Sequence, residues 1–137
     1  MEIKMIRRHE YAQYPLKATD GAAAYDLYAA AINMSAYYTE YDTGLTIEIP
    51  KGYVGIIAPR SSISNLPDAY LANSIGIIDS DYRGTIRCRF RGGNVNYQVG
   101  DRVAQLMIIK HEEVIFTEFT NVVATDRGEG GFGSSGR

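Results

Sequence analysis

The sequence predicts an all-β domain, a sandwich or barrel built from short strands. Helical periodicity is weak along the whole chain, whereas apolar and polar residues alternate in several short segments. Turn-forming residues separate these segments about every 8–12 residues, a spacing typical of sandwiches and barrels. The length of 137 residues fits a single domain.

Alternation and turn residues define the individual elements. The alternating segment 45–49 ends at Pro50, and Ile86, Cys88 and Phe90 alternate with three arginines. Because Cys88 shares the apolar side of its strand, we interpret it as a core residue rather than a nucleophile. The predicted strands are residues 45–49, 53–58, 75–78, 86–91, 95–99, 103–109 and 114–119, and a short helix is predicted within 62–71.

Composition and charge exclude several classes of protein. Hydrophobic residues form 45% of the chain and charged residues 22%, as in ordinary soluble globular proteins. The net charge of −2 argues against nucleic-acid binding but leaves room for a small anionic ligand. A single cysteine excludes an internal disulfide and a Cys-rich zinc site. There is no apolar run long enough to cross a membrane and no signal peptide, so we expect a cytoplasmic protein with no membrane partner.

The apolar segment 103–109 indicates contact with another subunit. Only Gln105 interrupts it, so both faces of this strand are predicted to be covered. A domain of this size has a limited core, and we expect one face to meet another copy. A closed sandwich with a few exposed apolar residues is the alternative. Gln105 itself needs hydrogen-bond partners, either from a neighbouring backbone or from a ligand.

Three polar groups in apolar surroundings are candidates for chemistry. Segment 79–84 holds two acids, a tyrosine and an arginine, and a carboxylate there can orient and deprotonate a water; the alternative is an Asp-rich hairpin turn. Arg60, Ser61 and Ser62 form a phosphate-binding set, or an ordinary turn in which a serine caps a helix. Asp26 lies in an apolar stretch and is either a metal-binding residue or a turn acid.

Residues 127–137 differ from the rest of the chain. They contain five glycines, whose backbone entropy disfavours any strand or helix. Glycine N–H groups, serine hydroxyls and arginine can surround a phosphate, and Phe132 can stack on a base. The alternative is a disordered terminus.

Five segments, in order, resemble the five motifs of the trimeric dUTPases. They are residues 24–30, 59–62, 73–84, 100–106 and 127–136, and the resemblance runs from about residue 22 to the last residue. The third segment, with GIIDSDYRG, and the fifth, RGEGGFGSSG, are closest to the family pattern. Five ordered matches are far more specific than any single one.

The resemblance implies a jelly-roll-like subunit in a homotrimer whose active sites are shared between subunits. It implies hydrolysis of dUTP to dUMP and pyrophosphate with Mg²⁺ on the triphosphate, which limits uracil entry into DNA and supplies dUMP for thymidylate synthesis. It further implies a β-domain over residues 1–126 and a flexible active-site arm over 127–137.

The resemblance also assigns roles to individual residues. Asp79 would activate the attacking water, Tyr82 would leave no room for a ribose 2′-hydroxyl, and Asp26 would contact Mg²⁺ through its water shell. The implied catalytic residues are Asp79, Gln105 and Arg127, and the implied substrate-binding residues are Arg60, Ser61, Ser62, Asn73, Gly76, Ile78, Tyr82, Phe132, Gly133, Ser134 and Ser135.

One segment departs from the family pattern, and two related functions compete. Residues 63–70 lack the usual lysine and glycine, which leaves the shape of this loop open. The related dCTP deaminases need a glutamate on the strand after the third motif, and residues 85–90 contain no acid. A regulatory binding protein on the same scaffold is the other alternative.

Overall fold

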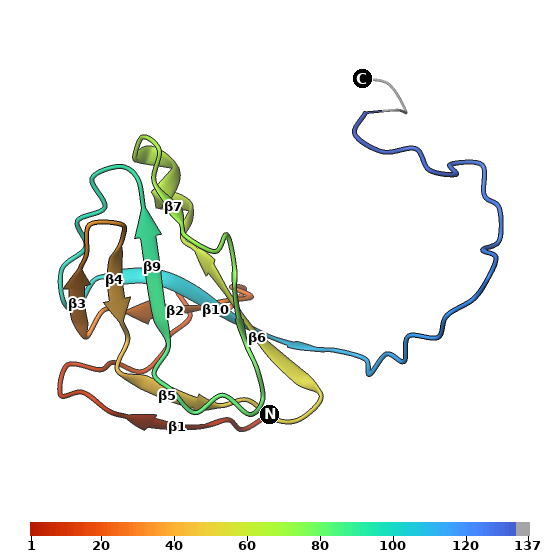
Figure 1. Cartoon of the computed structure of the whole chain (residues 1–137). Helices are drawn as coiled ribbons and strands as arrows, with labels where there is room; N and C mark the ends of the chain where they lie inside the picture. Colours follow the sequence, from red (N-terminus) through yellow and green to blue (C-terminus); the bar gives the residue numbers. More distant parts are fainter. Residues whose placement is uncertain (134–137) are drawn as a thin grey trace.

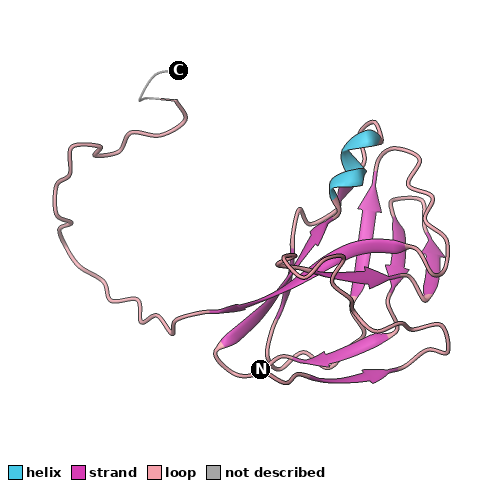
Figure 2. Ribbon diagram, turned by 180° about the vertical axis from the view of Figure 1, so that it is seen from behind, coloured by secondary structure: helices cyan, strands magenta, loops and turns pink. Residues whose placement is uncertain are grey.

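Antiparallel strands make up nearly all regular structure in the computed structural model of this chain, which describes residues 1–133 (Figures 1 and 2). Ser134 and Ser135 of the predicted site lie outside the described residues. The elements are β1 (Lys4–Arg7), β2 (Tyr25–Tyr28), β3 (Ala31–Met34), β4 (Thr39–Asp42), β5 (Leu45–Glu48), β6 (Tyr53–Pro59), the 3₁₀-helix η1 (Ser61–Asn65), β7 (Tyr70–Leu71), β8 (Gly76–Ile78), β9 (Arg87–Arg91) and β10 (Arg102–Lys110).

The strands form three antiparallel sheets, and the predicted all-β class is confirmed. Their orders are β1-β5, β2-β10-β6-β8 and β3-β4-β9-β7. Strands β5, β6, β8, β9 and β10 begin and end within one residue of the predicted segments. The predicted short helix is present as η1, which ends before Pro67. Strands β1 to β4 and β7 were not predicted.

The core lies between the sheets and follows the alternation of β9. Cys88 and Phe90 are buried, whereas the three arginines of β9 are exposed, as predicted. Burial raises the pKa of the Cys88 thiol to about 12, and the nearby Asp42 carboxylate acts in the same direction. The thiol therefore stays protonated at neutral pH, which agrees with a packing role.

The predicted strand at 95–99 is wrong, because a buried tyrosine takes its backbone groups. The Tyr41 hydroxyl donates to the Val95 carbonyl at 3.1 Å and accepts the Tyr97 N–H at 3.2 Å. These two groups need no neighbouring strand. The ring of Tyr97 packs edge-on against Tyr41 and Phe90, so the segment is fixed to the core without joining a sheet.

The predicted strand at 114–119 is also absent. After β10 the chain leaves the body and forms an extended arm, residues 111–133, in which the structure has no helix or strand (Figure 1). In the described residues the arm pairs with none of the strand edges of its own body, so it forms no ladder. Its large apolar side chains are exposed: Val114, Ile115, Phe116, Phe119, Val122 and Val123.

No helix within residues 1–133 is both long and apolar enough to cross a membrane.

Candidate active site

Polar side chains from three strands meet at one end of the β2-β10-β6 sheet. Asp26 of β2 lies between two arginines: its Oδ1 is 3.4 Å from Arg60 Nε, and its Oδ2 is 3.2 Å from Arg102 Nη1. Arg60 Nη1 also donates to the Arg102 carbonyl at 3.4 Å. Gln105 donates to the Pro59 carbonyl at 3.0 Å, so the predicted need for a partner is met by a neighbouring backbone. We call Asp26, Arg60, Arg102 and Gln105 the arginine end of the sheet.

A β-bulge brings Arg102 and Gln105 to the same side of β10. In a regular strand, residues three apart point to opposite faces. Gln105 pairs with Asp26, but Arg102 pairs with Tyr28, because the register shifts between Arg102 and Ala104. Asp26 and Tyr28 share one face of β2, and the bulge therefore places both β10 side chains on that face.

Arg60 reaches the same face from the other neighbouring strand. Gln105 pairs with Ala58 of β6, and Arg60 follows two residues later. Ser61 and Ser62 come next, at the start of η1, with exposed side chains. No side-chain hydrogen bond caps η1, so the alternative in which a serine caps the helix is wrong.

A tight turn after β8 carries Asp79 and Tyr82. The Tyr82 N–H donates to the Asp79 carbonyl at 3.1 Å, and the Tyr82 hydroxyl donates to the Thr85 carbonyl at 3.0 Å. The ring lies directly against Gly84, where a Cβ atom would overlap it. Arg83 donates to the Ser80 and Tyr82 carbonyls and holds the turn closed. This turn leaves the Asp79 carboxylate exposed to solvent.

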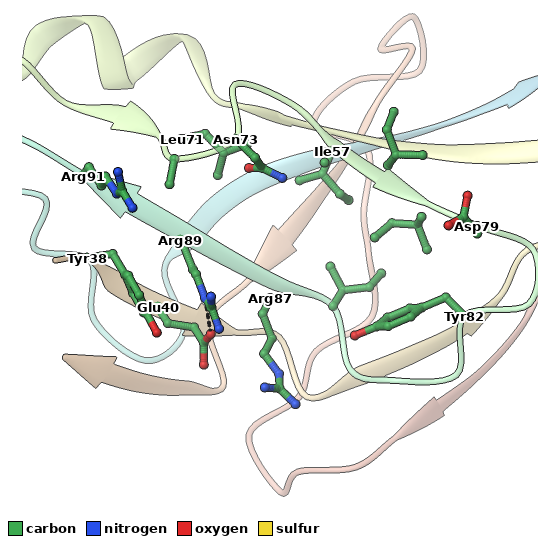
Figure 3. Close-up of a pocket in the computed structure, with 15 residues that line it drawn as sticks. Tyr38, Glu40, Ile57, Leu71, Asn73, Asp79, Tyr82, Arg87, Arg89 and Arg91 are labelled. Carbon is green, nitrogen blue, oxygen red and sulfur yellow. Dashed lines mark hydrogen bonds and ion pairs between the residues drawn. The ribbon is translucent and has the colours of Figure 1, made fainter. Parts of the chain in front are cut away.

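The turn borders a pocket of about 530 Å³, which lies in the range of small-ligand sites (Figure 3). Five of the predicted residues line it together: Asn73, Gly76, Ile78, Asp79 and Tyr82. Gly76 is required by the close approach of β8 to β6, since an added Cβ would lie 3.0 Å from the Ile57 Cβ. The pocket combines an apolar floor, Ile57 and Leu71, with polar groups on its rim.

The opposite wall of the pocket is formed by the arginines of β9. Arg89 donates to Glu40 at 2.7 Å and lies 4.5 Å from the centre of the Tyr38 ring (Figure 3). Burial would raise the pKa of Glu40, but hydrogen bonds from Arg89 and Asn33 outweigh it and lower the pKa. Arg87 pairs with Asp42 at 3.2 Å. These ion pairs fix the wall in place before any ligand binds.

The pocket turn and the arginine end are far apart within one copy. Ile78 pairs with Gly55, so Asp79 lies beside Val54 of β6. Arg60 is six residues further along, which at about 3.3 Å per residue is roughly 20 Å. The first, second and fourth motif segments thus come together at one end of the sheet, and the third forms a separate group.

The described part of the last motif segment is distant from both groups. Arg127 bonds only locally in the structure, to the Gly130 carbonyl at 2.9 Å, and Phe132 is fully exposed. Gly133 has a positive φ of 93°, which favours glycine. In this single copy the described arm extends away from the body (Figure 2), and Arg127, Phe132 and Gly133 do not line the pocket.

Sequence reasoning missed the roles of Arg102, of two arginines of β9 and of Glu40. Arg102 lies inside the fourth motif segment, but its place beside Asp26 depends on the bulge. Arg87 and Arg89 were assigned to an exposed strand face, and the alternation gave no sign that this face borders a pocket. Glu40 had no signal, because the strand that holds it was not predicted.

Comparison with known proteins identifies the family of the chain. The family model described as dUTPase matches residues 10–136. The chain belongs to the dUTPase family. The deoxyuridine 5′-triphosphate nucleotidohydrolase of Wolbachia pipientis wMel is 40% identical, over all of this chain and 95% of that protein. The corresponding protein of Dictyoglomus turgidum is 35% identical over 89% of each chain.

Solved dUTPase structures share the fold. The Staphylococcus bacteriophage 80alpha dUTPase with dUPNHPP matches with a TM-score of 0.83 at 21% identity, over 99% of both chains. A mutant dUTPase from phage phi11 of S. aureus, described with a structural Mg(II) ion, matches with a TM-score of 0.74 at 18% identity, over 90% of this chain and all of that one. The jelly-roll-like, dUTPase-type architecture predicted for the described residues is confirmed.

Proposed function

We propose that the active sites of this dUTPase, which hydrolyses dUTP to dUMP and pyrophosphate, are shared between the copies of a homotrimer. The observation that carries this proposal is the separation of roughly 20 Å along β6 between Asp79 and Arg60. A single copy cannot present both groups to one phosphoanhydride bond. A second copy that brings its arginine end to the pocket of the first supplies the missing phosphate-binding side chains.

The pocket is the proposed nucleoside site. Asn73 and the backbone of Gly76 and Ile78 form hydrogen bonds to the uracil edge, where a cytosine amine would meet the wrong partners. The Tyr82 ring packs under the deoxyribose and occupies the space of a ribose 2′-hydroxyl. The pocket volume and its mixed apolar and polar lining support this assignment.

Asp79 is the proposed general base. Its carboxylate is exposed at the pocket rim, where it can accept a proton from a water aligned with the α-phosphate. Negative charge then develops on the leaving pyrophosphate, and Arg60, Ser61, Ser62 and Gln105 of a neighbouring copy offer donors to it. The turn around Tyr82 supports the role, because its hydrogen bonds hold Asp79 in one place.

Mg²⁺ is the proposed cofactor, carried in by the triphosphate. Residues 1–133 contain no cluster of three or more His, Cys, Asp or Glu side chains suited to a metal ion. Each Asp26 oxygen lies beside an arginine and keeps lone-pair capacity for a water, which fits a water-mediated contact and does not fit direct coordination. When bound, Mg²⁺ neutralises charge on the phosphates.

The arm supports the proposed assembly. Phe116 is 94% exposed and Ile115 is 89% exposed, which is unfavourable for a free chain in water. A neighbouring copy can cover these side chains, and the arm then reaches an active site that its own body does not hold. There Phe132 stacks on uracil, Gly133 allows the turn, and Arg127, Ser134 and Ser135 contact phosphates.

The direct test is incubation of the purified protein with dUTP, dCTP or UTP in the presence of Mg²⁺. We expect pyrophosphate from dUTP alone, and a trimer mass by light scattering. Ammonia from dCTP would indicate the deaminase alternative. The absence of any reaction would favour a regulatory binding protein on this scaffold.

A further inference from the structure

The arginine end of the sheet contains a second cation that none of the assigned roles uses. Arg102 is held by Asp26 at 3.2 Å, yet 45% of its side chain is exposed. We infer that Arg102 is a second guanidinium of the phosphate site, and that Asp26 is a positioning residue that holds Arg60 and Arg102 side by side. This inference rests on the proposed function, because it assumes that phosphates bind at this end of the sheet.

Electrostatic repulsion between Arg60 and Arg102 favours a carboxylate between them. Two guanidinium groups on neighbouring strands repel each other, and a carboxylate between them offsets the repulsion. Asp26 is suited to this task because its two oxygens each face one arginine and its side chain is only 13% exposed. The group of three keeps a net charge of +1, which attracts a polyphosphate.

Both guanidinium groups keep N–H donors that the structure leaves unused. Arg102 uses one Nη1 contact, and Arg60 uses its Nε and one Nη1 contact. Each guanidinium has five N–H donors in a fixed plane, so several remain available for phosphate oxygens. Arg60 also bonds the Arg102 carbonyl, which ties the two residues together through the backbone.

The β-bulge in β10 determines which face of the sheet Arg102 occupies. Without the register shift between Arg102 and Ala104, Arg102 would lie on the face of the sheet opposite Gln105. Bulges commonly redirect a side chain next to an active site. Here the bulge places Arg102 on the face that holds Asp26 and Gln105.

The experiment measures binding of inorganic pyrophosphate by calorimetry with EDTA present, so that arginine contacts are measured without metal. We expect Arg102→Met to weaken pyrophosphate binding by about tenfold, the loss of one charge-assisted contact. Arg102→Lys restores the charge but not the planar fork and should lie between wild type and Arg102→Met. Asp26→Asn should weaken binding in the same direction. Lys4→Met, which removes one positive charge from β1, is the matched control and should bind as wild type does.

Steady-state kinetics with dUTP and Mg²⁺ separates phosphate binding by Arg102 from a purely structural role of this residue. Arg102→Met should raise KM by about tenfold and leave kcat within a few-fold, with an unchanged melting temperature. The inference is overturned if wild type does not bind pyrophosphate, if Arg102→Met binds it normally, or if Arg102→Met only lowers the melting temperature. If wild type binds pyrophosphate through Arg102 but does not hydrolyse dUTP, the proposed function fails and the phosphate site stands.

Discussion

Replacing Tyr82 by alanine should remove most of the discrimination between dUTP and UTP. The Tyr82 ring lies against Gly84 and is fixed by the hydrogen bond from its hydroxyl to the Thr85 carbonyl at 3.0 Å. Glycine has no side chain to fill the vacated space, so the alanine variant leaves room for one additional oxygen atom. Steric selection against one small group in a pocket is worth about 1–3 kcal/mol, or roughly 10- to 200-fold.

The assay is kcat/KM for dUTP and for UTP in wild type, Tyr82→Ala and Tyr82→Phe. The alanine variant should lower the ratio of kcat/KM for dUTP to kcat/KM for UTP by at least about tenfold, because the 2′-hydroxyl of UTP then has room. The phenylalanine variant keeps the ring and loses only the bond to Thr85, so its ratio should stay near that of wild type. An unchanged ratio in Tyr82→Ala would refute the steric role, whatever happens to the absolute rate.

Three other changes test separate parts of the account. Asp79→Asn should lower kcat by about 100-fold or more while dUTP still binds, because an amide cannot accept the proton of the water; single-turnover rates near wild type would disprove the assignment. Deleting all residues after Asp126 should lower turnover by about 100-fold with little change in melting temperature, and a truncated protein with the full rate would show that the tail is only a terminus. Tyr41→Phe should lower the free energy of unfolding in urea by about 2 kcal/mol, since Tyr97 N–H and Val95 carbonyl lose their partner, whereas Tyr37→Phe at an exposed position should not; equal stabilities would contradict the structure.

The sequence predicted those strands that have a strong pattern or a clear breaker. Pro50 and the alternation of β9 place β5 and β9 within one residue of their positions. Strands β1 to β4 contain four residues each and have no such boundary. Short strands depend on their partners for hydrogen bonds, and a local pattern does not identify those partners.

The candidate site was predictable residue by residue but not as an arrangement. The motif resemblance pointed to Asp26, Arg60 and Gln105, and the structure brings these three together at one sheet end. The contribution of Arg102 depends on a bulge that appears only when β10 is paired with β2. The apolar arm shows the same limit, because its alternation is typical of a strand, yet residues 111–133 have no partner strand in the structure.

Mixed trimers show whether active sites are shared between copies. Asp79→Asn damages the pocket turn and Arg60→Met damages the arginine end, so each variant alone should be nearly inactive. When the two variants are co-expressed at equal levels, a shared site has an intact pocket half the time and an intact arginine end half the time. We therefore expect recovery of about one quarter of wild-type dUTP hydrolysis. If the mixture is no more active than either variant alone, each site is built within one chain and the account is contradicted.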